Sequence, residues 1–354
     1  MSTDDGRADQ LHLNRAGVER VVFRQMTVAD LPGMRESTRE AIQDLRDRLS
    51  PRPRPDAEPP GRLAPNSDSE SPGRPTHGSA SEPPGRPSHG SDPESPLRPA
   101  PGAEASGSSG GGALVRRLLE ADAAGTWVAT VDDRVCGAAM AGLREGLWYL
   151  AHLHVRPGLQ GRGVGRRLLE AALGYGADAR GGLLHSSLDP AAMRRYQRAG
   201  FALEPAMDAT GMVRRAALPA IARVREGDAT DLELVAEVDR KQRGAAHGPD
   251  LEVLLSAGAR LLILDDRRQR GYGLIEDGQP AIVAAADTSA AVALLWAALA
   301  ESGDTVSVKV LRADQQWAID VAHQAGLGLE PTGPLCRQGD TGPLVPCLPH
   351  IGIL

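Results

Sequence analysis

The chain is poor in several residue types, and each shortage excludes a class of protein. Aromatic residues make up only 3% of the 354 residues. The three cysteines, Cys136, Cys336 and Cys347, show no CxxC or Cys/His spacing, so neither a disulfide framework nor a zinc cluster is predicted. Lysine occurs only at Lys241 and Lys309, and the net charge is −6. The absence of a dense basic run argues against nucleic acid as the main partner.

Signals for membranes and export are also missing. No apolar run reaches the roughly 18 residues that a membrane-spanning helix needs. The first ten residues, MSTDDGRADQ, are acidic and polar, unlike a secretory signal peptide. We therefore expect a cytoplasmic protein with no membrane partner. The sequence does not indicate an oligomeric state.

Residues 51–112 are dominated by Pro, Gly, Ser and Arg and contain a twelve-residue repeat: PPGRLAPNSDSE, SPGRPTHGSASE and PPGRPSHGSDPE. The units lack the branched and aromatic residues that bury a core, so we expect a disordered insert. The repeats could form a binding array, or they could have expanded in a permissive loop. His77 and His89 lie in this tract and are not considered catalytic.

The tract interrupts a first segment, residues 21–215, and a second segment follows it. The chain has 41% apolar residues, which suffice for two packed domains of the usual size, about 100–200 residues each. The first, residues 21–215, alternates strands and helices. We expect strands at 21–27, 127–131, 135–143, 147–155, 183–188 and 201–214, and helices at 31–49, 113–124, 164–179 and 190–199.

The second segment, residues 220–354, repeats the order of the first. HQAGLGLEP (323–331) echoes QRAGFALEP (197–205), and the segment opening at 221–240 echoes the one at 21–40. Two echoes in the same order indicate an internal duplication. We therefore predict an α/β (α+β) protein of two tandem domains. Each is a mixed, mostly antiparallel sheet flanked by helices, and residues 1–20 form a disordered tail.

A glycine-rich loop lies where the strand at 147–155 hands over to the next helix. The loop consists of Gln160, Gly161, Arg162, Gly163, Val164 and Gly165. Glycine lets a ligand approach the backbone, and the free N–H groups of a helix start suit a pyrophosphate. The nearby Arg166 and Arg167 add positive charge. A glycine turn before an Arg-rich surface helix is the structural alternative.

Other phosphate-binding motifs do not fit this loop. A P-loop is excluded because no Gly-Lys-Ser/Thr follows. A dinucleotide-binding fold is not favoured, because the spacing is not GxGxxG and no acidic residue follows at the ribose-binding distance.

With these motifs, the segment from Val21 to about Arg215 resembles the GNAT superfamily of acetyl-CoA-dependent N-acetyltransferases, in a tandem type with a degenerate second domain. The resemblance implies that the loop binds the pyrophosphate of acetyl-CoA. It implies that the strand end Leu153, His154 and Val155 binds the pantetheine arm. It also implies that Tyr196, in MRRYQRAGF, is the general acid.

The resemblance leaves the identity of the general base undecided, because many GNAT members use a Glu on this strand and residues 147–159 contain none. His152 and His154 stand two apart on this strand and therefore share a face. Histidine suits proton collection near neutral pH. The alternatives are a structural histidine pair and deprotonation by bulk water. His185 is the only nearby third ligand for a metal, so no metal site is predicted.

The second segment lacks both functional motifs. Residues 284–299 replace the loop without a glycine, and Ala322 stands where Tyr196 stands in the first segment. We expect this segment to complete a sheet, cover an edge or shape the acceptor cleft. The predicted activity is acetyl transfer to a primary amine of a small molecule, an aminoglycoside-like compound or a protein N-terminus. The alternatives are a non-catalytic acyl-CoA-binding regulatory module and a scaffold acting through the repeats.

Overall fold

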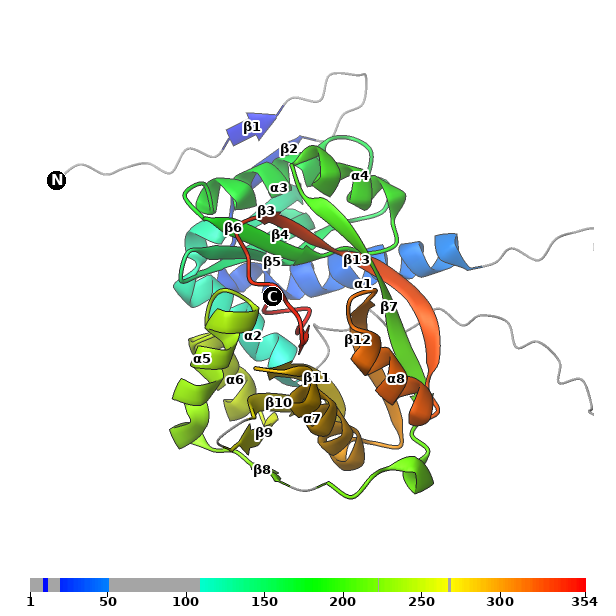
Figure 1. Cartoon of the computed structure of the whole chain (residues 1–354). Helices are drawn as coiled ribbons and strands as arrows, with labels where there is room; N and C mark the ends of the chain where they lie inside the picture. The colour runs from blue at the N-terminus through cyan, green and yellow to red at the C-terminus, as the bar shows by residue number, and fades with distance from the viewer. Residues whose placement is uncertain (1–8, 12–19, 51–108, 222, 267–268) are drawn as a thin grey trace, which may run out of the picture. The chain divides into compact units, whose positions relative to one another are not determined.

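The computed structural model describes residues 9–11, 20–50, 109–221, 223–266 and 269–354 (Figure 1). The predicted disordered insert therefore lies almost wholly outside the described residues. Its boundary at residue 112 was wrong, because helix α2 begins at Ser109. The predicted disordered tail was wrong at Asp9–Leu11, which pairs with the next strand as β1.

The main sheet contains nine of the described strands, in the order β1-β2-β3-β4-β5-β6-β13-β7-β12. Their bounds are β1 Asp9–Leu11, β2 Val21–Gln25, β3 Thr126–Val131, β4 Arg134–Arg144, β5 Leu147–Val155, β6 Gly181–His185, β13 Gly328–Gly339, β7 Ala202–Met212 and β12 Thr305–Arg312. The pairing is antiparallel except between β5 and β6, which run parallel. The mixed, mostly antiparallel sheet is confirmed.

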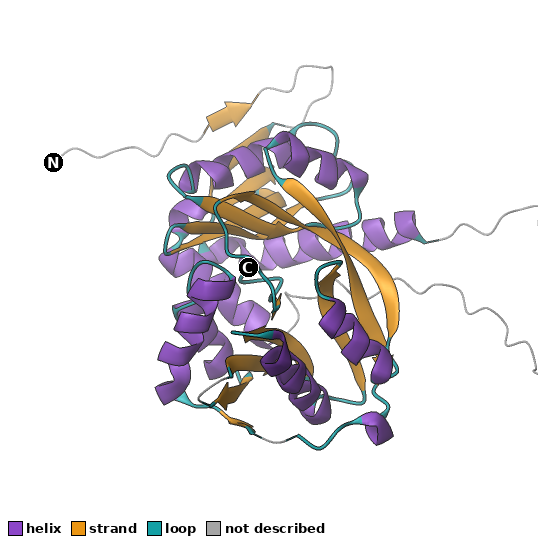
Figure 2. Ribbon diagram, in the orientation of Figure 1, coloured by secondary structure: helices purple, strands orange, loops and turns teal. Residues whose placement is uncertain are grey.

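Four helices of the first half flank this sheet (Figure 2). They are α1 Leu31–Leu49, α2 Ser109–Ala121, α3 Val164–Tyr175 and α4 Pro190–Arg198. Apolar side chains of α3 and α4 pack in one cluster with one face of β5, whereas those of α1 and α2 join a different cluster on the opposite face. The two faces of β5 therefore meet different helix pairs.

The second half builds a sheet of its own in the order β14-β11-β10-β9-β8. The strands are β14 Cys347–Leu348, β11 Gln279–Ala285, β10 Arg270–Glu276, β9 Arg260–Asp265 and β8 Val224–Glu226. The helices of this half are α5 Leu232–Gln242, α6 Pro249–Ser256, α7 Thr288–Glu301 and α8 Gln316–Gln324. The two sheets fit the predicted tandem architecture.

The two halves exchange their last long strands. β13, from the second half, lies between β6 and β7 of the first, so Cys336 pairs with Leu184 on one side and Leu203 on the other. In return, β7 pairs with β12 of the second half, with Val306 opposite Gly211. Figure 1 shows β13 crossing beside β6 and β7. Neither half therefore completes its hydrogen-bonded sheet alone.

A buried ion network also joins the halves. Arg144 on β4 donates from Nη2 to Asp122 at 2.8 Å and to Asp250, at the start of α6, at 2.7 Å. Tyr149 on β5 donates to the same Asp250 at 2.7 Å. Removing one member would leave buried charge uncompensated, which typically costs several kcal/mol. Consistent with this linkage, the described residues within 1–48 and 100–354 group into one compact unit.

None of the helices in the described ranges combines the length and hydrophobicity needed to cross a bilayer.

Candidate active site

The site begins where β5 and β6 separate. Their pairing runs from Leu147–Gly181 to Leu150–Leu184 and then stops, although β5 continues to Val155. β6 ends one residue later, at His185, and its other edge pairs with β13 along its whole length, from Gly181 opposite Gly339 to His185 opposite Leu335. One edge of β5 beyond Leu150 therefore offers its backbone groups to something other than β6.

A bulge at the same place sets which side chains face which helices. Met140 on β4 pairs with His152, whereas Ala141 pairs with Leu150, so Ala151 is an extra residue on β5. Because a bulge shifts the alternation of side chains, Leu150 and Leu153 pack in the same cluster with α3 and α4. The two predicted histidines point to the other face, towards α1.

The glycine loop lies at the start of α3, as predicted. Gly163 is the N-cap residue, its φ is +87°, and it provides no side-chain cap. A Cβ added at Gly163 would meet no atom within 4 Å, so the space beside the helix start is open. At Gly165 an added Cβ would lie 3.2 Å from Val155 Cγ2, so the packing there is tight and a side chain would push its neighbours aside. The first N–H groups of α3 are thus presented to an approaching anion.

Gln160 ties this loop to the end of β5. Its Nε2 donates to the carbonyl of Val155 at 3.0 Å, while Arg48 on α1 donates to its Oε1 at 3.4 Å. Arg162 is exposed and Val164 is buried, so only the former can offer its side chain to a ligand. The loop and the strand end therefore form one connected unit.

The two histidines are brought together, with His152 Nε2 2.9 Å from His154 Nδ1. Their partners, which the sequence analysis missed, are Ser37 and Thr38 on α1. Ser37 Oγ lies 2.6 Å from His154 Nε2, and Thr38 Oγ1 lies 3.0 Å from His152 Nε2. Neither hydroxyl has a recognisable signal in the sequence, because they lie more than a hundred residues from the histidines.

The hydrogen bonds of the Ser37 and Thr38 hydroxyls determine which ring nitrogens of the two histidines carry hydrogen. Ser37 and Thr38 both donate to the carbonyl of Met34, at 3.1 and 2.7 Å. Each hydroxyl has one hydrogen, so both must accept from the histidines. His154 then carries its hydrogen on Nε2 and accepts at Nδ1, and His152 carries its hydrogen on Nε2. This assignment leaves Nδ1 of His152 as a hydrogen-bond acceptor.

Burial keeps these rings neutral. It lowers the pKa of His152 to about 4 and that of His154 well below its usual range, with the neighbouring His152 and Arg156 adding to the second shift. His185, at the end of β6, has its pKa lowered to about 4, chiefly by burial. No group of three or more potential metal ligands is found among the described residues.

Tyr196 lies on α4 with 5% of its surface exposed. It packs in the same cluster as Val155, at the end of β5, and Cys336, on the inserted strand β13. Burial raises the pKa of the phenol, so the hydroxyl keeps its proton at neutral pH. The side chains around Tyr196 therefore come partly from the second half of the chain.

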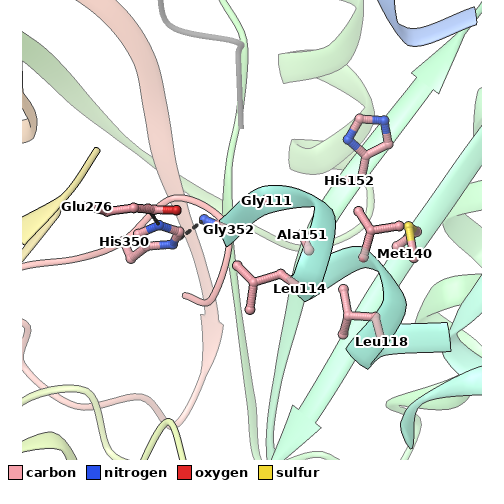
Figure 3. A pocket seen from close by; sticks show the side chains of 10 residues that line it. Gly111, Leu114, Leu118, Met140, Ala151, His152, Glu276, His350 and Gly352 are labelled. Atoms are coloured by element: carbon pink, nitrogen blue, oxygen red, sulfur yellow. Dashed lines mark hydrogen bonds and ion pairs between the residues drawn. The ribbon is translucent and has the colours of Figure 1, made fainter. Parts of the chain in front are cut away.

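A cavity of about 60 Å³ lies on the histidine side of β5 (Figure 3). Residues from both halves line it: Gly111, Leu114, Val115, Leu118, Met140, Ala151, His152, Glu276, His350 and Gly352. The sequence analysis predicted neither Glu276 nor His350 for the site.

Comparison with known proteins finds a family match over part of the chain. The model of the acetyltransferase (GNAT) family matches residues 99–201, which contain β5, the glycine loop and Tyr196. The chain contains a GNAT-family domain. Members of this family transfer acyl groups from acyl-CoA, so this GNAT domain is that of an acyltransferase. No curated protein matches the chain by sequence.

A solved structure shares the fold along nearly the whole chain, and others align with part of it. A protein from Pyrococcus horikoshii described as a candidate acetyltransferase is 16% identical and has a TM-score of 0.63. The match covers 97% of this chain and 95% of that one. A GCN5-related N-acetyltransferase from Kribbella flavida is 19% identical over 64% of this chain and 62% of its own, with a TM-score of 0.43. A tandem GNAT protein from the clavulanic acid biosynthesis pathway is 15% identical over 60% and 82%, with a TM-score of 0.38.

Proposed function

We propose that the protein is an N-acetyltransferase that moves an acetyl group from acetyl-CoA to a primary amine. The observation that carries the proposal is the juxtaposition of three features at one strand. β5 leaves β6 after Leu150, its far end leads into an uncapped helix start, and a buried tyrosine lies in the same core cluster as Val155 at that end. These features match the needs of a thioester donor with a pyrophosphate.

The first role belongs to the glycine loop and the strand end. The backbone N–H groups at Gly163–Gly165 would bind the pyrophosphate, helped by the partial positive charge of the helix start. The edge of β5 beyond Leu150 that β6 does not pair, at Leu153 and Val155, would hold the pantetheine arm in the manner of an added strand. Both contacts use main-chain atoms, which tolerate changes in side chain.

The second role is proton removal from the amine, and Nδ1 of His152 is the proposed acceptor. The amine nitrogen attacks the thioester carbonyl carbon, the C–N bond forms, and the C–S bond breaks. The proton lost by nitrogen passes to His152, while Tyr196 donates its proton to the departing thiolate. The low pKa of His152 makes it a weak base, so it suits an amine that arrives uncharged. An amine that arrives protonated would first have to lose a proton to water.

A turnover assay tests the proposal directly. Thiol release from acetyl-CoA should depend on an added primary amine, and mass spectrometry should find the amine heavier by one acetyl group. Binding of acetyl-CoA without thiol release across a broad amine panel would favour the regulatory module instead.

A further inference from the structure

Arg195 on α4 places its guanidinium against the first turn of α3. The position that a Cβ would take at Gly165, the second residue of α3, lies 3.2 Å from Arg195 Cζ and 3.3 Å from its Nη1. The same position lies 3.2 Å from Val155 Cγ2, at the end of β5. Because the Cα–Cβ bonds of a helix tilt towards its N-terminus, the guanidinium lies near the helix start. Arg195 therefore stands where the strand end meets the glycine loop.

This position is electrostatically unfavourable for an arginine in the protein alone. The start of α3 carries free N–H groups and a partial positive charge, and Gly163 supplies no side-chain cap. Cations stabilise the other end of a helix, so Arg195 adds positive charge where the helix already has it. In the part of the chain that the structure describes, the guanidinium of Arg195 forms no hydrogen bond or ion pair. The two positive groups together fit an anion that carries more than one charge.

The second half of the chain provides an internal comparison. Its segment HQAGLGLEP aligns with QRAGFALEP, which places Val321 of α8 at the position of Arg195. Val321 is buried in the core of that half, and the helix start of α7 is capped by the carboxylate of Asp287. The arginine is thus absent where a carboxylate already satisfies the helix start. Arg195 and the uncapped start of α3 occur together, as expected of two parts of one anion site.

Arg195 is also the neighbour of the proposed acid. Burial raises the pKa of the Tyr196 phenol, and the charge of Arg195 acts in the opposite direction. The guanidinium is therefore close enough to influence proton donation as well as donor binding. An experiment on Arg195 has to separate these two effects.

We propose that Arg195 is a donor-binding residue that pairs with the pyrophosphate of acyl-CoA and so selects this donor over a thioester without phosphate. The inference rests on the proposed function, which names acetyl-CoA as the donor. A guanidinium presents its N–H groups in a planar fork that matches two phosphate oxygens. The main-chain N–H groups at Gly163–Gly165 would bind other oxygens of the same pyrophosphate.

The experiment compares two donors on the full chain with the same amine. They are acetyl-CoA and S-acetyl-N-acetylcysteamine, which keeps the thioester and the end of the pantetheine arm but has no phosphate. Arg195→Gln should raise the KM for acetyl-CoA by about 10-fold or more, the usual loss when a charge-assisted hydrogen bond is removed. It should change kcat/KM for the short donor by less than about threefold, because no phosphate contact is lost.

Arg194→Gln is the matched control, because Arg194 is an exposed arginine on the same helix. It should leave the kinetics with both donors unchanged. Arg195→Lys keeps the charge without the planar fork, so its KM for acetyl-CoA should lie between those of the wild type and Arg195→Gln. If Arg195→Gln lowers kcat/KM equally for both donors, Arg195 acts through Tyr196 or through the fold, and the pyrophosphate contact is wrong.

Calorimetry with CoA separates this inference from the proposed function. Weaker CoA binding in Arg195→Gln, but not in Arg194→Gln, supports the contact even if no amine is acetylated, and acetyl transfer alone then fails. The difference between the wild type and Arg195→Gln should shrink at high salt, because ions screen the attraction between charges. CoA affinity of Arg195→Gln within about twofold of the wild type, with acetyl transfer intact, would overturn the inference and leave the proposed function standing.

Discussion

The starts of α3 and α7 hold equivalent places in the two halves but treat an anion differently. α3 follows β5 and begins at Gly163, whose lack of a side chain leaves the helix N–H groups uncapped. α7 follows β11 and begins after Asp287, whose carboxylate accepts from the N–H of Ala290 at 3.0 Å. A negative charge already occupies the helix start in the second half, so a pyrophosphate would meet repulsion there.

The helices α4 and α8, which lead into the repeated segments QRAGFALEP and HQAGLGLEP, also differ in the polar groups they carry. Tyr196 on α4 belongs to the core cluster that also contains Val155 of β5, whereas its counterpart Ala322 on α8 is fully buried in the core of the second half. One half carries groups that can handle charge, whereas the other has a self-contained cap and an apolar residue at the corresponding places. Related topology therefore does not imply related chemistry.

The largest expected effect comes from separating the halves. A chain ending near Ala220 loses β13, so β6 and β7 each lose a strand partner and expose apolar surface. We expect insoluble or unfolded protein, measured by gel filtration and circular dichroism. A soluble truncated protein with full activity would show that the second half is dispensable.

Tyr196→Phe should lower kcat by roughly 10²-fold, because it removes the proton donor and keeps the ring. The affinity for acetyl-CoA, measured by calorimetry, should hardly change. Tyr175→Phe is the control, since this hydroxyl donates to Asp122 at 2.8 Å on a structural network. A rate for Tyr196→Phe within a few-fold of the wild type would make that tyrosine purely structural.

Gly163→Val should weaken acetyl-CoA binding by about 10-fold or more, because its side chain would occupy the open space at the helix start. Gly258→Val is a close match: its φ is +103° and an added Cβ also meets no atom within 4 Å. Both variants share the backbone strain, typically about 1–2 kcal/mol. Equal acetyl-CoA affinities in the two would contradict the loop assignment.

The buried histidines should make the protein sensitive to acid. The folded pKa of His152, about 4, lies below its unfolded value of 6.5, so the unfolded chain binds more protons between these values. Stability is therefore full above about pH 6.5 and falls as the pH drops towards 4, by about 2–3 kcal/mol for this residue. Melting temperatures at pH 7 and pH 5 should differ less in His152→Gln than in the wild type.

The smallest effect sharpens the comparison of the two helix starts. Intact protein should bind one acetyl-CoA per chain, at the first half. Asp287→Ala removes the cap of α7 and should cost about 1 kcal/mol of stability without creating a second site, because Ala322 and the glycine-free start remain. Calorimetric titration that gives two acetyl-CoA sites per wild-type chain would contradict the prediction that the second half binds no acetyl-CoA.

Local features of the fold were readable from the sequence. The predicted helix at 31–49 and strand at 147–155 agree with α1 and β5. Their side-chain periods differ, and each period is repeated over enough residues to be distinctive. The glycine loop and Tyr196 were also found locally, although their roles stay predictions.

The tertiary structure alone decided how the halves share strands and what surrounds the histidines. The insertion of β13 between β6 and β7 rests on backbone hydrogen bonds, which leave no mark in the side-chain pattern. The contacts of His154 with Ser37, and of Glu276 with His350, join residues 117 and 74 positions apart. Sequence periodicity reports which face of an element is buried, but only packing determines which distant element covers that face.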